Sequence, residues 1–336
     1  MTSPASFEPL VDSFGRVHTD LRISVTDRCN IRCFYCMPNE NVQFKPQHDL
    51  LTFEELERFV RAAATIGITK LRLTGGEPLV RRDLHVLVKK LASIGGMKDL
   101  ALTTNGILLA EQADALKEAG LRRINISLDA LDEPTFRKIA RRDGLAQVLA
   151  GIEAAQRVGF EKIKLNAVAI AGITEPQIVP LGRFARERGL ELRFIEYMPL
   201  DAERTWRNEQ VLSGDDILAT LEAEFGPLEQ VAPQHPGQPA RDYHFVAGGG
   251  VVGFINPVTH PFCGDCNRLR ITAEGQLRNC LFSQTEWDVR ELLRGGASDE
   301  RIVALMRDCV AAKLAGHGIG GPGFTQPERA MFQIGG

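Results

Sequence analysis

Residues 21–38, LRISVTDRCNIRCFYCMP, decide the fold and the chemistry of this chain. The apolar run Leu21–Val25 predicts a strand, and Cys29, Cys33 and Cys36 follow it with the spacing C-x3-C-x2-C. Barrel folds place their chemistry in the loops that leave the carboxyl ends of the strands. Three thiolates without a His in the motif favour an iron–sulfur cluster over a structural zinc, which usually takes four protein ligands. Three ligands on a four-iron cluster leave one iron open for a small molecule.

A second cysteine triad lies near the other end of the chain. Cys263, Cys266 and Cys280 have the spacing C-x2-C-x13-C within PFCGDCNRLRITAEGQLRNCLF, residues 261–282. The two triads use six of the seven cysteines, and the seventh, Cys309, lies in an amphipathic stretch where we expect a buried, inert thiol. Free thiols kept for metals indicate a reducing cytoplasm rather than a disulfide framework. Two triads predict two clusters.

A strand-then-helix pattern fills the first 200 residues. Apolar or β-branched runs predict six strands, at Leu21–Val25, Leu71–Thr74, Leu100–Thr104, Ile124–Leu128, Ile163–Ile170 and Leu192–Tyr197. The clearest helix begins after Thr52, which forms a capping box with Glu55. Alternating strands and helices indicate an α/β fold with a parallel sheet, and six units are too few to close an eight-unit barrel. We therefore expect a partial (β/α)6 TIM-like barrel over residues 1–210.

Residues 211–336 do not continue the alternation of strands and helices, and we expect them to form a C-terminal region that carries the second triad. Ser213 caps one more helix, and the Pro- and Gly-rich stretch after Pro227 predicts a loop. The later elements are two short strands, a hairpin and two helices, expected near Tyr243–Val246, Val251–Ile255, Arg270–Thr272 with Gln276–Arg278, Glu286–Leu293 and Asp299–Leu314.

Composition narrows the class of protein. The chain has 336 residues, 44% of them hydrophobic, so it has enough apolar material for a large core. Its formal net charge of −3 does not predict broad attraction to nucleic acid. The N-terminus lacks a charged start followed by an apolar run, and no apolar stretch approaches 18 residues, so we expect neither secretion nor a membrane span.

The first triad, with an aromatic residue before its last cysteine, resembles the radical S-adenosylmethionine (radical SAM) superfamily. Thr74–Pro78, TGGEP, resembles the motif of that superfamily that binds the methionyl amino group. The resemblance implies a 4Fe-4S cluster whose fourth iron is chelated by S-adenosylmethionine, and reductive cleavage to a 5′-deoxyadenosyl radical. It also implies S-adenosylmethionine contacts at Tyr35, Gly76, Ser127 and Met198.

The second triad and the chain end Ile334-Gly335-Gly336 closely resemble the GTP 3′,8-cyclase family of molybdenum cofactor biosynthesis, almost from end to end. The resemblance implies a lyase that removes the ribose 3′ hydrogen of GTP and joins C3′ to C8 of guanine. A second 4Fe-4S cluster would bind guanine through its open iron. The product would be (8S)-3′,8-cyclo-7,8-dihydroguanosine 5′-triphosphate. The Gly-Gly tail is expected to enter the active site and to help bind or activate S-adenosylmethionine.

Basic residues around the expected barrel mouth suit a triphosphate. Arg268 and Arg270 have period-2 spacing, so both guanidinium groups leave one face of a strand. Positions that match the family's motifs imply GTP contacts at Arg22, Arg72, Thr103, Lys164, Arg268, Leu269 and Arg270. Of these, Arg22, Arg268 and Arg270 are the expected catalytic residues.

The resemblance also implies partners and leaves alternatives. It implies an external electron donor and transfer of the product to cyclic pyranopterin monophosphate synthase, and it leaves room for a homodimer. A second reading is another radical SAM enzyme with an auxiliary cluster, such as a peptide maturase, although those usually carry more C-terminal cysteines than three. A third is a non-enzymatic module in which the triads hold zinc or a passive cluster.

Overall fold

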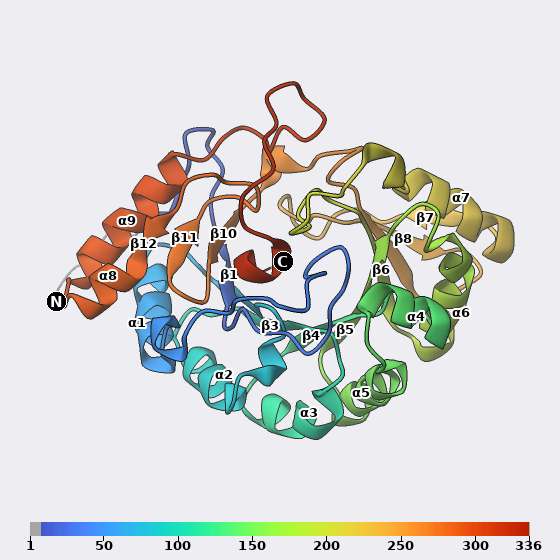
Figure 1. The fold of residues 1–336 in the computed structure, drawn as a ribbon, viewed down its shortest axis with the longest axis horizontal. Coiled ribbons are helices and arrows are strands. Elements are labelled where there is room, and N and C mark those ends of the chain that lie inside the picture. Colours follow the sequence, from blue (N-terminus) through green and yellow to red (C-terminus); the bar gives the residue numbers. More distant parts are fainter. Residues whose placement is uncertain (1–7, 336) are drawn as a thin grey trace.

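The computed structural model describes residues 8–335, and its centre is one twelve-stranded sheet. Six parallel strands that follow one another in the sequence form the middle of this sheet: β1 (Asp20–Ser24), β2 (Lys70–Thr74), β3 (Asp99–Thr104), β4 (Arg123–Ser127), β5 (Lys162–Ala169) and β6 (Glu191–Glu196). Each lies within one or two residues of a predicted strand, and Figure 1 shows them as part of an arc. The predicted partial α/β barrel is confirmed.

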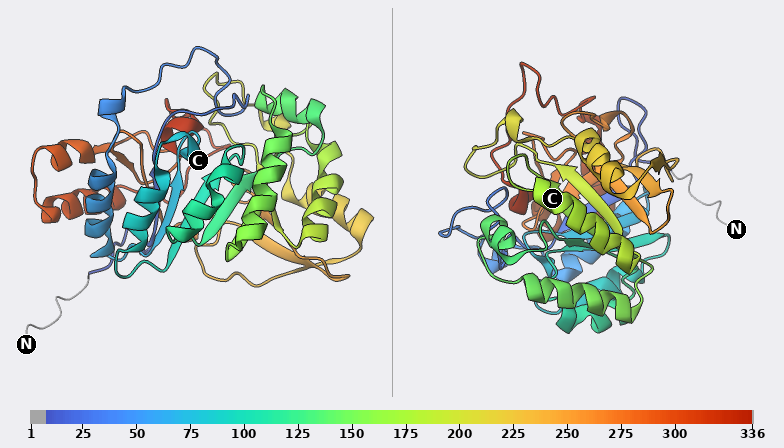
Figure 2. Two further views of the ribbon diagram at one scale, coloured as in Figure 1. Left: turned by 90° about the horizontal axis from the view of Figure 1, so that it is seen from below. Right: turned by 90° about the vertical axis from the view of Figure 1, so that its right-hand side faces the viewer.

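Helices cover the outside of the arc (Figures 1 and 2). The helices of the first part are α1 (Phe53–Ala64), α2 (Leu84–Ala92), α3 (Leu109–Glu118), α4 (Glu133–Ala140), α5 (Leu145–Val158) and α6 (Ile178–Arg188). The predicted capping box of α1 is present, because Thr52 Oγ1 accepts from the amide of Glu55 at 3.1 Å and Glu55 Oε2 accepts from the amide of Thr52 at 2.7 Å.

The C-terminal part extends the same sheet at both edges. Its elements are α7 (Gly214–Phe225), β7 (Leu228–Gln230), β8 (Arg241–Phe245), β9 (Val251–Ile255), β10 (Arg268–Ile271), β11 (Gln276–Arg278), β12 (Trp287–Asp288), α8 (Val289–Arg294), α9 (Asp299–Ala311) and α10 (Met331–Ile334). Strand β10 pairs in parallel with β1, and β9 pairs in parallel with β6. Antiparallel strands follow outward on each side, and among residues 8–335 the end strands β12 and β7 do not meet. The barrel is therefore longer than six strands but still open.

Alternation along the strands separates a polar inner face from an apolar outer face. On β1, Leu21 and Ile23 are fully buried in the main hydrophobic core, whereas Arg22 lines the central cavity. Strands β2 and β10 follow the same alternation, with Arg72 and Arg270 on the cavity side. The apolar outer face holds the helices, and the polar inner face is left for ligands.

Two predicted helices have different bounds in the structure. The helix predicted over 286–293 begins only at Val289, because Trp287–Asp288 pairs with β11 and the Asp288 carboxylate caps α8 by accepting from the amide of Glu291. The helix predicted over 299–314 ends at Ala311. Beyond it, the carbonyls of Leu314 and Ala315 accept from Arg16. These carbonyls therefore form long-range contacts with the N-terminal segment.

Within the described part of the chain, none of the helices is both long and apolar enough to span a bilayer.

Close helix packing at the end of β3 gives a test of the fold. A Cβ added to Gly151, on α5, would lie 2.4 Å from the backbone oxygen of Gly106, whereas one added to Gly182, on α6, would meet only side-chain atoms at 2.9 Å or more. Backbone atoms move aside less easily than the end of a flexible side chain. We therefore expect Gly151→Ala to lower the free energy of unfolding by about 1–3 kcal/mol. Gly182→Ala should change it by less than about 1 kcal/mol. Equal denaturation midpoints for the two variants would contradict this packing.

Candidate active site

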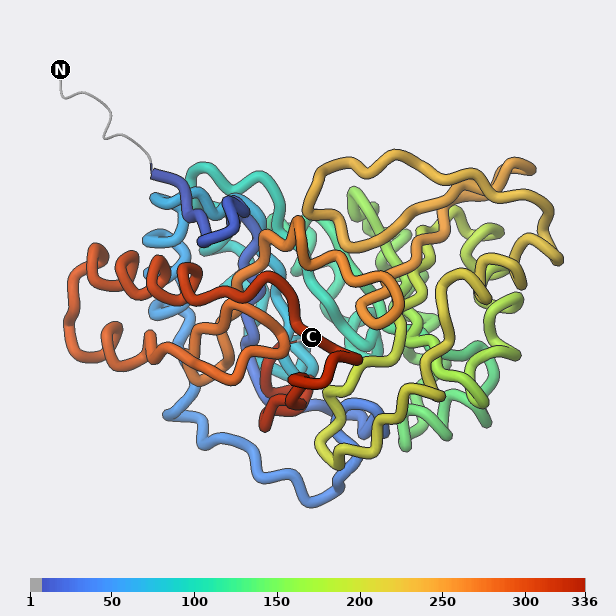
Figure 3. Tube along the Cα trace, turned by 90° about the horizontal axis from the view of Figure 1, so that it is seen from above, coloured from blue at the N-terminus to red at the C-terminus, as the bar shows by residue number. Residues whose placement is uncertain are grey.

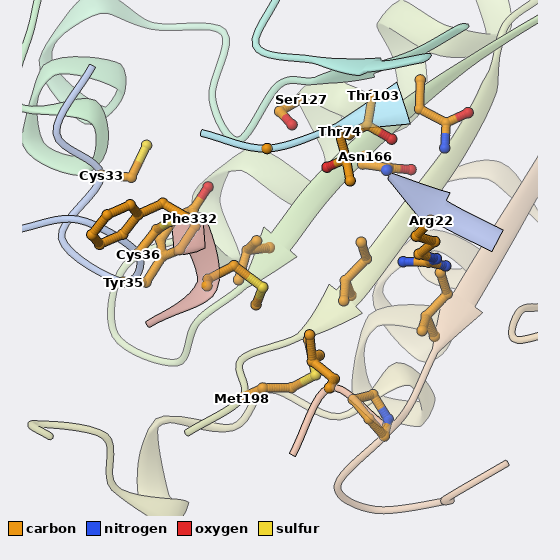
Figure 4. A pocket seen from close by; sticks show the side chains of 18 of the residues that line it. Arg22, Cys33, Tyr35, Cys36, Thr74, Thr103, Ser127, Asn166, Met198 and Phe332 are labelled. Carbon is orange, nitrogen blue, oxygen red and sulfur yellow. The ribbon is translucent and has the colours of Figure 1, made fainter. Parts of the chain in front are cut away.

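A cavity of about 320 Å³ lies inside the arc, and all six cysteines of the two triads line it. Figure 4 shows Cys33 and Cys36 on one side of this space and Arg22 on the other. Nine further residues predicted for the site also line the cavity: Arg22, Tyr35, Arg72, Gly76, Thr103, Ser127, Met198, Arg268 and Arg270. Residues distant in sequence thus line one cavity.

The first triad occupies the loop that follows β1. Cys33 accepts hydrogen bonds at its carbonyl from the amides of Cys36 and Met37, at 3.0 and 2.9 Å, which form a tight turn that contains Cys33 and Cys36. Burial raises the pKa of the Cys29 thiol to about 11 and that of Cys36 to about 12. Metals bind the thiolate, so loading this loop must release protons.

The Gly75-Gly76-Glu77 turn after β2 packs against the cysteine loop and is hydrogen-bonded to it. The amides of Gly76 and Glu77 donate to the carbonyls of Thr26 and Arg28 at 2.7 and 2.8 Å. A Cβ on Gly76 would lie 2.3 Å from the Arg28 oxygen, so a side chain there would displace the loop. The cysteine loop therefore fills the space in the Cβ direction of Gly76.

Glu77 is buried, and its carboxylate is occupied by protein donors. It accepts from Thr104 Oγ1 at 2.7 Å and from the amides of Asn105 and Leu79 at 2.7 and 2.9 Å. Burial nevertheless raises its pKa to about 7. Asn105 in turn directs its Nδ2 to Asn30 Oδ1 at 2.7 Å and lies 3.8 Å from Cys29 Sγ. Glu77 therefore fixes the end of β3 against the first triad.

The second triad lies beside two cations. Cys263 and Cys266 lie in a turn before β10, and Cys280 follows β11. Arg268 directs Nε and Nη2 to Cys266 Sγ at 3.3 and 3.2 Å, and Lys313 Nζ lies 3.4 Å from the same sulfur. Burial opposes ionisation of Cys266, but the charges of Arg268 and Lys313 outweigh it and lower the pKa of this thiol to about 6. This sulfur is therefore already disposed to act as a thiolate ligand.

Thiols are the candidate metal ligands of this cavity. A zinc ion needs its sulfur ligands within about 2.3 Å, which brings them close together. Among residues 8–335, no three His, Cys, Asp or Glu side chains are close enough to hold one metal ion. A cubane cluster binds each thiolate through a different iron, and each triad brings three thiols to the cavity.

Three arginines form a row across adjacent strands. Arg22 on β1 lies opposite Arg270 on β10 and Arg72 on β2, and all three line the cavity. Burial lowers the pKa of Arg22, and the charges of Arg270 and Arg72 lower it further. The Nε atoms of Arg22 and Arg72 are buried without a hydrogen-bond partner. Like charges held together with unused donors form a site for an anion with several negative charges.

Two predicted GTP contacts lie away from this row. Lys164 is absent from the cavity lining and forms a buried ion pair with Glu191, which also accepts from Arg193 Nε at 2.8 Å. Burial lowers the pKa of Lys164 to about 7. Leu269 is fully buried in the hydrophobic core between the two cavity-lining arginines of β10. Its side chain therefore belongs to the outer face of the sheet.

The structure adds residues that the sequence analysis did not select. Asn105 and Arg193 line the cavity, and Lys313 contacts the second triad. Asn105 follows β3 just as the first triad follows β1. Its position after a predicted strand could therefore have identified it as a candidate site residue. Lys313 has no such signal, because it lies 47 residues from Cys266 and reaches it only through the fold.

The C-terminal tail reaches the cavity. The Gly335 carbonyl accepts from Arg270 Nη1, and a Cβ on Gly335 would lie 2.7 Å from Thr74 Cγ2 and 3.1 Å from Ser24 Cβ. Figure 1 shows the tail inside the arc of strands. Gly335 therefore fits where a larger residue would clash, and Gly336 lies outside the described residues.

Comparisons with known proteins agree with this geometry. Residues 23–185 match the radical SAM superfamily, and residues 190–319 match Molybdenum Cofactor Synthesis C. The chain is 52% identical to the GTP 3′,8-cyclase of Rhodopirellula baltica, covering 100% of this chain and 94% of that protein. It is 48% identical to the GTP 3′,8-cyclase 2 of Mycobacterium tuberculosis, covering 98% and 92%.

A solved structure supports the fold. Streptococcus suis SuiB bound to S-adenosylmethionine superposes with a TM-score of 0.60 at 16% identity, covering 96% of this chain and 76% of SuiB. The open barrel and the cysteine loop after β1 define a radical SAM enzyme, a class that carries a 4Fe-4S cluster and S-adenosylmethionine. Within that superfamily the chain belongs to the GTP 3′,8-cyclase family.

The contact between Gly76 and the cysteine loop predicts a defect in metal loading. In a background with Cys263, Cys266 and Cys280 replaced by Ser, Gly76→Ala should reduce the affinity for iron by about tenfold or more, because the added Cβ displaces the Arg28 carbonyl. Gly264→Ala is the control, since its Cβ would have no neighbour within 4 Å. Iron analysis after anaerobic reconstitution measures both. Equal loading would contradict the supporting role of the turn.

Proposed function

We propose that this chain converts GTP and S-adenosylmethionine to (8S)-3′,8-cyclo-7,8-dihydroguanosine 5′-triphosphate, the first step of molybdenum cofactor biosynthesis. The observation that carries the proposal is the row of Arg270, Arg22 and Arg72 between two cysteine triads in one cavity. The names of the full-length relatives support GTP as the substrate.

The second triad is proposed to hold a second 4Fe-4S cluster that binds the guanine. Its three cysteines supply three ligands, and Arg268 and Lys313 stabilise a thiolate at Cys266. In this proposal residues 1–210 provide the barrel and first cluster, and residues 211–336 provide the second cluster and the tail. The pairing of β1 with β10 joins the two parts into a single sheet.

The side chains of the cavity have distinct proposed roles. Arg22, Arg268 and Arg270 would hold and neutralise the triphosphate. Arg72 and Thr103 also line this cavity, and Arg72 Nη1 lies 3.5 Å from Thr103 Oγ1. When bound, the first cluster and S-adenosylmethionine supply the 5′-deoxyadenosyl radical. Fixing the triphosphate would hold the ribose in one orientation toward the cofactor pocket.

Other predicted residues would bind or shape the cofactor pocket. Tyr35, Gly76, Ser127 and Met198 are the proposed S-adenosylmethionine contacts, and all line the cavity. The Tyr35 hydroxyl donates to Asp129 Oδ2 at 2.7 Å, which fixes the ring beside the first triad. Lys164 and Leu269 remain proposed GTP contacts. Leu269 would have to make its contact through the backbone, because its side chain is buried in the core, and Lys164 would have to leave Glu191 to reach the phosphates.

The proposal includes partners that act outside the site. Cluster reduction needs an external electron donor, and the product would pass to cyclic pyranopterin monophosphate synthase. The seven free cysteines suit a reducing cytoplasm. A homodimer is compatible with this proposal.

Anaerobic turnover tests the proposed function. Reconstituted protein with S-adenosylmethionine, a strong reductant and GTP should form both 5′-deoxyadenosine and a cyclised nucleotide, detected by mass spectrometry. Cys266→Ser should retain the first cluster but lose nucleotide turnover, because the second cluster lacks a ligand. If the wild type formed 5′-deoxyadenosine but no nucleotide product, the protein would still be a radical SAM enzyme, but GTP would be excluded as its substrate. Neither product, at full iron content, would indicate a passive carrier.

The arginine row predicts opposite effects on binding and stability. Arg22→Met should weaken GTP binding by about tenfold or more, because it removes charge-assisted hydrogen bonds to phosphate. Without GTP it should raise the free energy of unfolding by about 1 kcal/mol, since it removes a buried charge and its repulsion with Arg270 and Arg72. Equilibrium dialysis and denaturant titration measure the two effects. The exposed Arg122→Met is the control, and unchanged GTP affinity in Arg22→Met would exclude Arg22 from the anion site.

A further inference from the structure

We propose that Arg329 is a positioning residue that latches the C-terminal tail to Glu274 and Glu286 and thereby sets the Gly335 carbonyl on Arg270, which lines the cavity. The catalytic consequence rests on the proposed function, whereas the latch itself is a property of the folded chain. Figure 3 traces the red tail back over the orange C-terminal strands toward the centre of the molecule.

The latch is an ion-pair network that joins the tail to the turn between β10 and β11 and to the residue before β12. Arg329 Nη1 pairs with Glu274, and its Nε and Nη2 pair with Glu286 Oε1 and Oε2 at 2.5 and 2.7 Å. Glu286 is shared with Arg278, whose side chain is only 2% exposed. A planar guanidinium that meets two carboxylates forms one of the stronger charge-assisted contacts in proteins.

The burial of Glu274 makes this network specific for the tail. Glu274 is 5% exposed and lies in the turn between β10 and β11. Within residues 8–335, Arg329 is the only side chain that pairs with its carboxylate. The docked tail supplies the partner of this carboxylate, so the ion pair favours the docked position.

The residues that follow Arg329 contact the residues that line the cavity. The amide of Met331 donates to the Leu200 carbonyl at 3.1 Å, and Phe332 packs with Met37 beside Cys29 and Cys36. Figure 4 shows Phe332 next to Cys36 and Tyr35. Gly335 follows, against Thr74, with its carbonyl on Arg270. The seven residues from Arg329 to Gly335 thus join the hairpin, the first triad and the arginine row.

Hydrogen exchange of the full-length chain tests the latch. We expect Arg329→Met to speed exchange of the amides of 331–335 by about tenfold or more, because the docked state loses its ion pairs. Glu274→Gln should act in the same direction, and Arg329→Lys should retain part of the protection, since it keeps the charge but not the fork. The control is Arg183→Met, which removes an exposed ion pair with Glu224 on the far helices.

Turnover adds a second readout. Arg329→Met should reduce GTP turnover toward that of a chain that ends at Ile334, and Arg329→Lys should recover part of the loss. Tail exchange in Arg329→Met that matches Arg183→Met would overturn the latch. Equal acceleration of the β3 amides would also overturn it, because the effect would then be general destabilisation. Failure of the wild type to turn over GTP would contradict the proposed function but leave the exchange result to decide the latch.

Discussion

Repulsion among three arginines on one face of a parallel sheet is the constraint on which the site depends. Register places Arg270, Arg22 and Arg72 at one level, and alternation turns all three inward while Leu21 and Ile23 are buried on the outer face. The apolar face stabilises the sheet strongly enough to tolerate the charged row. An anion with several charges relieves the repulsion, so the stability of the fold and the binding of substrate are physically linked.

The pairing of β1 with β10 organises the remainder of the site. Strand β1 leads into the first triad, and β10 begins directly after Cys266 of the second. The two sulfur sets therefore face one cavity but differ in their electrostatic surroundings. Glu77 and Asp129, whose pKa values burial raises to about 7 and 6, flank the first triad, whereas Arg268 and Lys313 contact the second. This asymmetry suits two sites with separate tasks, one for the cofactor and one for the substrate.

Local sequence signals predicted the elements well but not the long-range contacts. The six central strands, the Thr52 cap and the Glu274-Gly275 hairpin follow from periodicity and turn chemistry within short windows. The attachment of β9 and β10 to opposite edges depends on pairing between distant segments, which periodicity does not encode. For the same reason the Lys164–Glu191 pair and the contact of Lys313 with Cys266 became visible only in three dimensions.

The most direct test of the account is turnover of GTP deuterated at the ribose 3′ position under anaerobic reducing conditions. If the arginine row fixes the triphosphate so that the ribose faces the cofactor, deuterium should appear in 5′-deoxyadenosine in step with the cyclised nucleotide. Deoxyadenosine that forms with GTP present but carries no deuterium would contradict the account, because the ribose would then not be the group presented to the radical.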